Sequence, residues 1–441
     1  MFTNQDLKRL IFPLIVEQVL AVTIGMADTI MVSGSGEAAV SGIALVDVIN
    51  VLLINIFSAL ATGGAVVSSQ YLGKQEPENA CVAAKQLIYV TLLFSLVIML
   101  ACLTLRDFLL TNIFGNIDPQ VMKNAQIYFA ISAYSYPFLA LYNAGAALFR
   151  SMGNSRISMF TSLLMNMANI GGNALLIFGF GMGVRGAAIA SLVSRMLGCV
   201  IMLLLLRHRE NSIHIEHLLT LEFRPAMVRS ILSVGVPTGL ENGIFQIGKV
   251  LVQGLIVSIG TTAIAANAIA NNIASMEVIP GAAIGLALIT VVGQCVGAQD
   301  YVQARQYTIK LMKITYLSMI ALNAAILIFC HPIVNVYRMS EQTTSVALQL
   351  LIIHGIGAMI IWPLSFTLPN ALRAAGDAKF TMTVSIISMW TCRIGLSYLF
   401  VHMMGWGVPG VWFAMISDWG VRTTAFVIRF CGSRWQHKRL V

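Results

Sequence analysis

The stretch IFPLIVEQVLAVTIGMADTIMV, residues 11–32, is almost wholly apolar but carries two acids, Glu17 and Asp28. It is long enough for an α-helix to cross the ~30 Å hydrocarbon core of a bilayer. An ionised side chain near the bilayer centre costs at least ~2.5 kcal/mol, so an acid there indicates a function or a buried polar partner. The two acids are about three helical turns apart and therefore lie on one side of the helix. We expect that side to face protein or water.

The composition of the whole chain extends this pattern. Of the 441 residues, 58% are hydrophobic and only 10% are charged, and the mean hydropathy is +0.82. Soluble domains carry roughly 25% charged residues. The sequence therefore predicts an all-α integral membrane protein. Its twelve expected spans are residues 11–32, 43–72, 87–105, 124–148, 157–180, 187–206, 231–258, 264–296, 311–330, 346–372, 380–404 and 411–430.

The basic residues predict the orientation. With the N-terminus in the cytoplasm, 19 of the 27 Lys and Arg fall at cytoplasmic ends of spans and four at the other ends. The positive-inside rule then places both termini in the cytoplasm, and we expect a multi-pass protein of the plasma membrane. The net charge of +9 is explained by this bias, so no nucleic-acid partner is expected. The remaining four basic residues lie within spans and need partners. They are Arg195, Lys249, Arg393 and Arg422.

The second half of the chain repeats the first at an offset of 224 residues. The matches, in chain order, are Pro13 with Pro237, Glu17 with Glu241, 70–76 with 294–300, 150–154 with 373–377 and 183–186 with 407–410. Each half holds an even number of spans, so the two copies have the same orientation in the membrane. This pattern predicts two pseudo-symmetric six-helix bundles, residues 1–206 and 231–441, with a substrate site between them near the midplane.

Residues 207–230 form the most polar stretch and predict a cytoplasmic linker. Its three histidines, His208, His214 and His217, fit a solvated linker better than a metal site. The seven cysteines are scattered without paired spacing, which predicts neither a disulfide framework nor a metal centre. Arg150 and Arg373 follow expected spans, where they could meet helix C-termini and lipid phosphates.

Several motifs together resemble the multidrug and toxic compound extrusion (MATE) family. They are Ala27-Asp28-Thr29 in the first span, Gln-x-x-Gly at 70–73 and 294–297, and Arg-x-x-Gly-Asn/Asp at 150–154 and 373–377. The similarity covers essentially the whole chain. It implies two six-helix bundles forming a V-shaped cleft, and secondary antiport in which H⁺ or Na⁺ enters while small organic, often cationic, compounds leave. It also implies no cofactor beyond the coupling ion and contact with membrane lipids, and we expect a monomer.

The resemblance implies a cation-coupling site at Asp28, Asn169, Asn173 and Ser191. Related prokaryotic members carry an acid at the position of Asn173, so this chain departs from their pattern. The oxygens of these side chains suit Na⁺, but a lone carboxylate in a low-dielectric cavity equally favours taking up a proton. The sequence therefore leaves the ion open and favours H⁺. Hydrogen bonding between helices is the alternative role for the two asparagines.

The second half does not repeat this site, because Val252 occupies the position of Asp28. Candidates for a substrate or ion pathway are Glu17, Glu241, Gln246, Lys249 and Glu277. Because Glu17 and Glu241 match within the repeat, a symmetric structural role explains these two better. A buried lysine needs a counter-charge, so we expect Lys249 to pair with Glu241 or Glu277. We also expect Asp418 and Arg422, four residues apart, to form an ion pair along one helix. The sequence identifies no partner for Arg195 or Arg393.

Two other functions are alternatives for this sequence. A flippase for a lipid-linked saccharide would use unpaired Arg or Lys to bind pyrophosphate, and Lys249, Arg195 and Arg393 keep that alternative open. An intramembrane enzyme is a remote alternative, because the sequence has no HExxH, GxSxG or P-loop motif. The sequence therefore predicts a transporter and not an enzyme.

Overall fold

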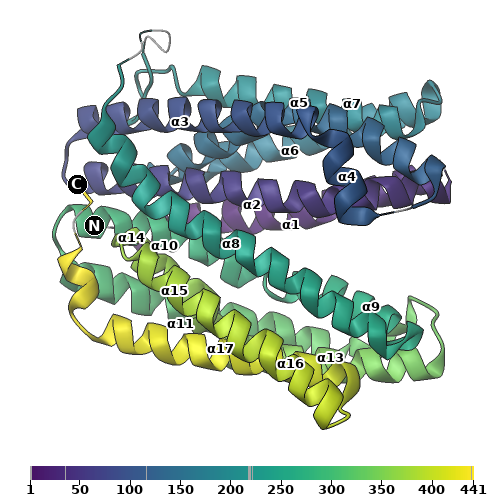
Figure 1. Ribbon diagram of the computed structural model, residues 1–441. Helices are drawn as coiled ribbons and strands as arrows, with labels where there is room; N and C mark the ends of the chain where they lie inside the picture. Colours follow the sequence, from purple (N-terminus) through teal and green to yellow (C-terminus); the bar gives the residue numbers. More distant parts are fainter. Residues whose placement is uncertain (1, 35, 116, 217–219, 221, 439) are drawn as a thin grey trace. The chain divides into compact units, whose positions relative to one another are not determined.

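The computed structural model describes residues 2–34, 36–115, 117–216, 220, 222–438 and 440–441, and within these it is helical without a strand (Figure 1). The helices before the linker are α1 (Asn4–Ser33), α2 (Glu37–Gly73), α3 (Pro77–Thr104), α4 (Arg106–Phe114), α5 (Pro119–Ser151), α6 (Ser155–Asn173), the π-helix η1 (Ala174–Gly179) and α7 (Gly183–Leu205). Those after it are α8 (Pro225–Ile259), α9 (Thr261–Glu277), α10 (Ile279–Gly297), α11 (Tyr301–Ile328), α12 (Cys330–Asn335), α13 (Glu341–Ile360), η2 (Pro363–Thr367), α14 (Leu368–Ala374), α15 (Ala378–Ser388), η3 (Met389–Gly395), α16 (Leu396–Tyr398), η4 (Leu399–Met403), α17 (Gly407–Cys431) and η5 (Arg434–His437).

Each of the twelve expected spans has a helical counterpart, and among the described residues ten helices qualify as spans by length and composition alone. Several of the expected spans are interrupted, and in two of them a proline lies at the interruption. The expected span 264–296 is α9 followed by α10, with Pro280 in the first turn of α10. The expected span 346–372 passes from α13 through η2, which begins at Pro363, to α14. Proline lacks a backbone N–H and favours such changes in hydrogen bonding.

The repeat is visible in the backbone. Every described residue with a positive φ has a counterpart 223 or 224 residues away: Gly36 and Gly260, Gln75 and Gln299, Gly115 and Arg338, Gly153 and Gly376, Gly181 and Gly405, and Gly183 and Gly407. Ten of these residues lie in the connections between helices, and Gly183 and Gly407 are the first residues of α7 and α17. The two halves therefore share their turns as well as their apolar runs.

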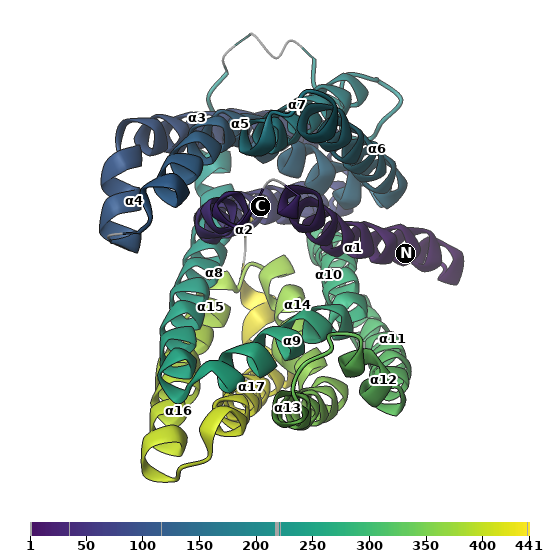
Figure 2. The same cartoon turned by 90° about the vertical axis from the view of Figure 1, so that its right-hand side faces the viewer.

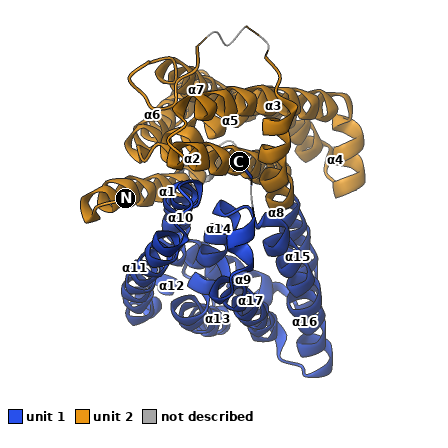
Figure 3. Cartoon of the chain, turned by 90° about the vertical axis from the view of Figure 1, so that its left-hand side faces the viewer, with its two compact units in different colours: residues 1, 240–441 blue, residues 2–239 orange. Residues whose placement is uncertain are grey.

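The chain divides into two compact units, residues 2–239 and 240–441, here called the N-terminal and C-terminal units (orange and blue in Figure 3). The division lies within α8, downstream of the polar linker. Our sequence-based limits of the lobes, 1–206 and 231–441, stay a prediction.

In the N-terminal unit, α5 lies between α3 and α7, and α6 packs on α7 (Figure 2). Helix α2 packs on α5, and α1 packs on α6. The contact between α1 and α6 places the acids of α1 beside the polar residues of α6.

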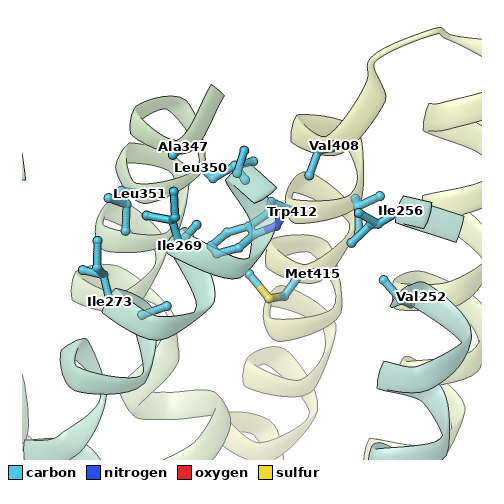
Figure 4. Close-up of a cluster of buried hydrophobic side chains, with 14 of the residues drawn as sticks. Val252, Ile256, Ile269, Ile273, Ala347, Leu350, Leu351, Val408, Trp412 and Met415 are labelled. Carbon is cyan, nitrogen blue, oxygen red and sulfur yellow. The ribbon is translucent and has the colours of Figure 1, made fainter. Parts of the chain in front are cut away.

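The C-terminal unit has a core of buried side chains from α8, α9, α13 and α17 (Figure 4). Trp412 lies in this core and is 3% exposed. Its indole Nε1 donates a hydrogen bond to Asn267 Oδ1 on α9, at 2.9 Å, so its polar atom is satisfied.

Candidate functional site

The four residues expected to couple a cation lie together in the N-terminal unit. Asp28 is on α1, Asn169 and Asn173 are on α6, and Ser191 is on α7. The two asparagines are four residues apart and share one face of α6. Helix α6 changes to the π-helix η1 directly after Asn173, and such changes occur often at functional sites.

A continuous chain of hydrogen bonds joins these side chains. Asn173 Nδ2 donates to Asp28 Oδ1 at 2.6 Å and to Asn169 Oδ1 at 3.1 Å. Asn169 Nδ2 donates to Ser191 Oγ at 3.1 Å. Asn173 Oδ1 is buried and has no hydrogen-bond partner among the described residues. The cluster therefore holds several oxygen atoms around one carboxylate, one of them unused.

Burial separates Asp28 from its neighbours. Asn169 and Asn173 are 2% and 0% exposed, whereas Asp28 is only half-buried. The carboxylate thus sits at the accessible end of a buried polar chain. This arrangement suits a group that exchanges an ion or a proton with water.

Two further charges act on this cluster. Asp28 is close enough to Asp47, on α2, and to Arg195, on α7, to interact electrostatically with both charges. Arg195 Nη1 also donates to Ser135 Oγ on α5 at 2.6 Å, a partner that the sequence did not identify. Sequence reasoning did not connect Asp47 with Asp28. The available signal was its position as the single acid of the apolar span 43–72.

Glu17 and Glu241 occupy matching positions in the two units and have matching partners. Glu17 accepts hydrogen bonds from Arg150 Nη1 at 3.0 Å and from Ser158 Oγ at 2.7 Å. Glu241 accepts them from Arg373 Nη2 at 2.8 Å and from Ser385 Oγ at 2.6 Å. The two glutamates therefore anchor structural ion pairs.

This pairing revises our expectation for the two arginines, which we placed at lipid phosphates. Arg150 and Arg373 instead reach back into their own units to Glu17 and Glu241. Because both the acid and the arginine recur in the repeat, the pairing could have been found from the sequence.

The expected partners of Lys249 were wrong. Glu241 pairs with Arg373 and, at 3.3 Å, with Arg422, whereas Glu277 contacts His354 Nδ1 on α13. Among the described residues no carboxylate lies within ion-pair distance of Lys249. Sequence reasoning also missed His354, because nothing in a lone histidine within an apolar span points to an acid 77 residues away.

The expected ion pair between Asp418 and Arg422 is also absent from the described contacts. Asp418 Oδ1 accepts a hydrogen bond from Ser388 Oγ at 2.5 Å, and Arg422 turns to Glu241. Gln246, the last pathway candidate, is half-buried on α8.

The polar linker shows no metal site in its described part. His214 Nδ1 lies 3.8 Å from Cys81 Sγ, which is a hydrogen-bond distance to sulfur, and its Nε2 lies 3.7 Å from Glu216 Oε1. Within the described ranges no group of three His, Cys, Asp or Glu side chains is arranged for a metal ion. His217 lies outside the described residues.

The model of the MatE protein family matches this chain twice, at residues 13–175 and 237–399. The two matches begin 224 residues apart, which is the offset of the internal repeat. The chain belongs to the MatE family. It is therefore a multi-pass membrane transporter and not an enzyme.

Curated relatives align over nearly the full chain. The uncharacterized transporter YisQ of Bacillus subtilis is 27% identical, with 97% of this chain and 94% of the relative covered. The probable multidrug resistance protein NorM of Thermotoga maritima is 26% identical, with 99% and 94% covered. These alignments leave no large part of the MatE chain without a counterpart.

Solved structures show the same fold. An outward-facing multidrug resistance MATE family transporter superposes with a TM-score of 0.91 at 19% identity, with 99% of this chain and 97% of the other covered. A MATE structure in a bent conformation gives 0.89 at 19% identity, with 97% and 95% covered. The two-lobed helical fold expected for a MatE protein is confirmed.

Proposed function

We propose that this MatE protein is a secondary active antiporter that exports small organic, often cationic, compounds in exchange for an inward flow of H⁺ or Na⁺. Curated relatives carry the name of probable multidrug resistance proteins, which supports multidrug efflux. We place the protein in the plasma membrane as a monomer with both termini in the cytoplasm. It needs no cofactor other than its coupling ion.

The observation that carries the proposal is the chain of hydrogen bonds from Asp28 through Asn173 and Asn169 to Ser191. Polar and ionisable groups buried within a membrane are costly, and those that occur there mark ion and substrate pathways. The carboxylate is half-buried and its neighbours are buried, so an ion bound there would be shielded from lipid. Ion uptake and release at Asp28 would then change the contacts between α1 and α6.

We propose H⁺ as the coupling ion in preference to Na⁺. Asn173 presents its amide Nδ2 to Asp28, where an acid would present oxygen to a cation. With Asn at this position the site has less negative charge to strip water from Na⁺. A proton on Asp28 removes the acceptor charge that holds the Asn173 amide, so α1 would bend differently in the two protonation states.

Na⁺ remains the competing ion, because the chain offers it ligands. Asp28, the unused Asn173 Oδ1, Asn169 and Ser191 would supply hard oxygen atoms, which alkali cations prefer. Using them would require the Asn173 amide to rotate away from Asp28. That rotation distinguishes Na⁺ binding from protonation.

The experiment is export of a fluorescent organic cation from proteoliposomes, with pH and Na⁺ gradients imposed separately. We expect a pH gradient in Na⁺-free medium to drive transport. Transport that is absent there and returns on adding a Na⁺ gradient would make Na⁺ the ion. Absence of transport under both gradients would contradict the antiport proposal.

A further inference from the structure

Three cationic side chains surround one aromatic ring in the C-terminal unit. The ring is that of Phe245 on α8. From its centroid, Lys249 Nζ lies at 5.2 Å, Arg393 Cζ at 5.0 Å and Arg422 Cζ at 5.9 Å. Each cation is within reach of the electron-rich face of the ring. The cations converge although they come from three elements, α8, η3 and α17.

The carboxylates of the same region do not neutralise these cations. Glu241 is shared between Arg373 and Arg422, and Asp418 is hydrogen-bonded to Ser388. Among the described residues, no carboxylate lies within ion-pair distance of Lys249 or Arg393. Asp418 interacts with Arg393 only through its longer-range field. With Arg373 included, this region therefore holds four cations and two carboxylates, and its net charge is positive.

Two of the cations are accessible. Lys249 is exposed and Arg393 is half-buried, whereas Arg422 is 2% exposed. Lys249 lies ten residues before the end of α8, about 15 Å along the helix, which is too far for its side chain to reach the headgroup region beyond that end. An unpaired cation at such a depth is costly and indicates a function.

The internal repeat relates these cations to the cation-coupling cluster of the N-terminal unit. At the offset of 224, Arg393 occupies the position that Asn169 has in the cation-coupling cluster of the N-terminal unit. Val252 replaces Asp28, and Lys249 lies one turn before it. The same place in the fold thus carries a carboxylate and amide oxygens in one unit and cations in the other. This position therefore favours a cation in the N-terminal unit and an anion in the C-terminal unit.

We infer that Lys249, Arg393 and the Phe245 ring form a binding site for the anionic group of an amphipathic organic molecule. The group is a carboxylate, sulfonate or phosphate, and Phe245, which packs edge-on against Phe366 at 6.2 Å, contacts the apolar body. The two cations donate charge-assisted hydrogen bonds to the anion. The compounds carried by the proposed exporter then include acidic and zwitterionic ones. This extension rests on the proposed function, whereas binding of the anion at this site is independent of it.

The test is equilibrium binding in nanodiscs of phosphatidylcholine, measured by fluorescence anisotropy. The probes are rhodamine B, a dye with one free carboxylate, and its ethyl ester, which lacks that charge. We expect Lys249→Gln and Arg393→Gln each to weaken rhodamine B binding by about tenfold or more, the effect of losing a charged hydrogen bond. Binding of the ester should change by less than about twofold, which also reports that the variants are folded.

The control variant is Lys313→Gln, which removes an exposed lysine of α11 in the same unit and should leave both dyes unaffected. Equal wild-type affinity for the two dyes, including binding of neither, would overturn the inference. So would equal losses for both dyes in Lys249→Gln. Failure of transport with the dye preference intact would count against antiport and not against this site.

A second arm identifies the source of the anion. In nanodiscs containing phosphatidylglycerol, a site for lipid headgroups would bind rhodamine B more weakly in the wild type, and Lys249→Gln would abolish that competition. An unchanged affinity would assign the site to soluble organic anions. Competition that persists unchanged in Lys249→Gln would show that the lipid acts elsewhere and would contradict a lipid source.

Discussion

At the residue scale, Asp28 is the residue on which the proposed coupling depends. We predict that Asp28→Asn abolishes export under either ion gradient and leaves the protein folded. Asparagine keeps the size of the side chain and can still meet the Asn173 amide, but it cannot take up a proton or carry a charge. The measurement is dye export from proteoliposomes, with elution in size-exclusion chromatography as the check of folding.

The control for Asp28→Asn is Glu78→Gln, which removes an exposed acid at the start of α3. It should export at the wild-type rate. Normal gradient-driven export by Asp28→Asn would show that coupling takes place elsewhere in the chain.

Asn173 is the residue that we expect to decide the ion. We predict that Asn173→Asp shifts export towards dependence on Na⁺, because a second carboxylate next to Asp28 strengthens the attraction for a cation. The substitution also replaces the amide donor that now contacts Asp28 at 2.6 Å. The measurement is the ratio of export rates under the Na⁺ and pH gradients. An unchanged ratio would indicate that Asn173 does not belong to the coupling site.

Glu241 and Glu17 both anchor buried ion pairs, and that of Glu241 is the more deeply buried. We predict that Glu241→Gln lowers the stability of the protein by ~3–5 kcal/mol, because it leaves Arg373 and Arg422 without their carboxylate. Glu17→Gln should cost less. Its single arginine, Arg150, is 14% exposed, whereas Arg422 is 2% exposed. Thermal unfolding in detergent measures both, and a larger loss for Glu17→Gln would contradict this ranking.

At the scale of elements, close helix contacts depend on glycine at particular positions. A Cβ added at Gly63 on α2 would lie 2.4 Å from the backbone oxygen of Ile231 and 2.8 Å from the backbone nitrogen of Gly235, both on α8. Backbone atoms cannot move aside as a flexible side chain does. The two helices therefore approach each other only because this position lacks a side chain.

We predict that Gly63→Ala destabilises the protein by ~1–3 kcal/mol through overpacking. The matched control is Gly254→Ala on α8, where no atom lies within 4 Å of an added Cβ. There alanine should be neutral or stabilise the helix by up to ~1 kcal/mol. Melting temperatures of the two variants in detergent measure the difference. Equal melting temperatures would show that α2 and α8 are further apart than described.

At the scale of the whole molecule, the charge bias of the loops predicts the orientation. We predict that both termini and the linker face the cytoplasm. Alkaline phosphatase fused after Asp118 should be active, since the segment before α5 is then outside, and the same enzyme fused after Glu210 should be inactive. A fluorescent protein fused after Val441 should be fluorescent. The reverse activities of the two phosphatase fusions would invert the topology.

The sequence by itself determined the membrane class, the helical spans and the twofold repeat. Hydropathy and repetition are read along the chain, so they need no knowledge of which helices meet. The family motifs also located Asp28, Asn169, Asn173 and Ser191, which the structure joins in one chain of hydrogen bonds.

Only the tertiary structure decided the partners of the buried charges. Glu241 lies eight residues from Lys249 on one helix, yet it bonds to Arg373, 132 residues away. A helix residue meets whatever the neighbouring helix presents at the same depth, and that depends on the rotation and spacing of packed helices. Neither quantity is written in the local sequence. The same reason explains how Lys249 and Arg393 come to share the ring of Phe245 without an acid between them.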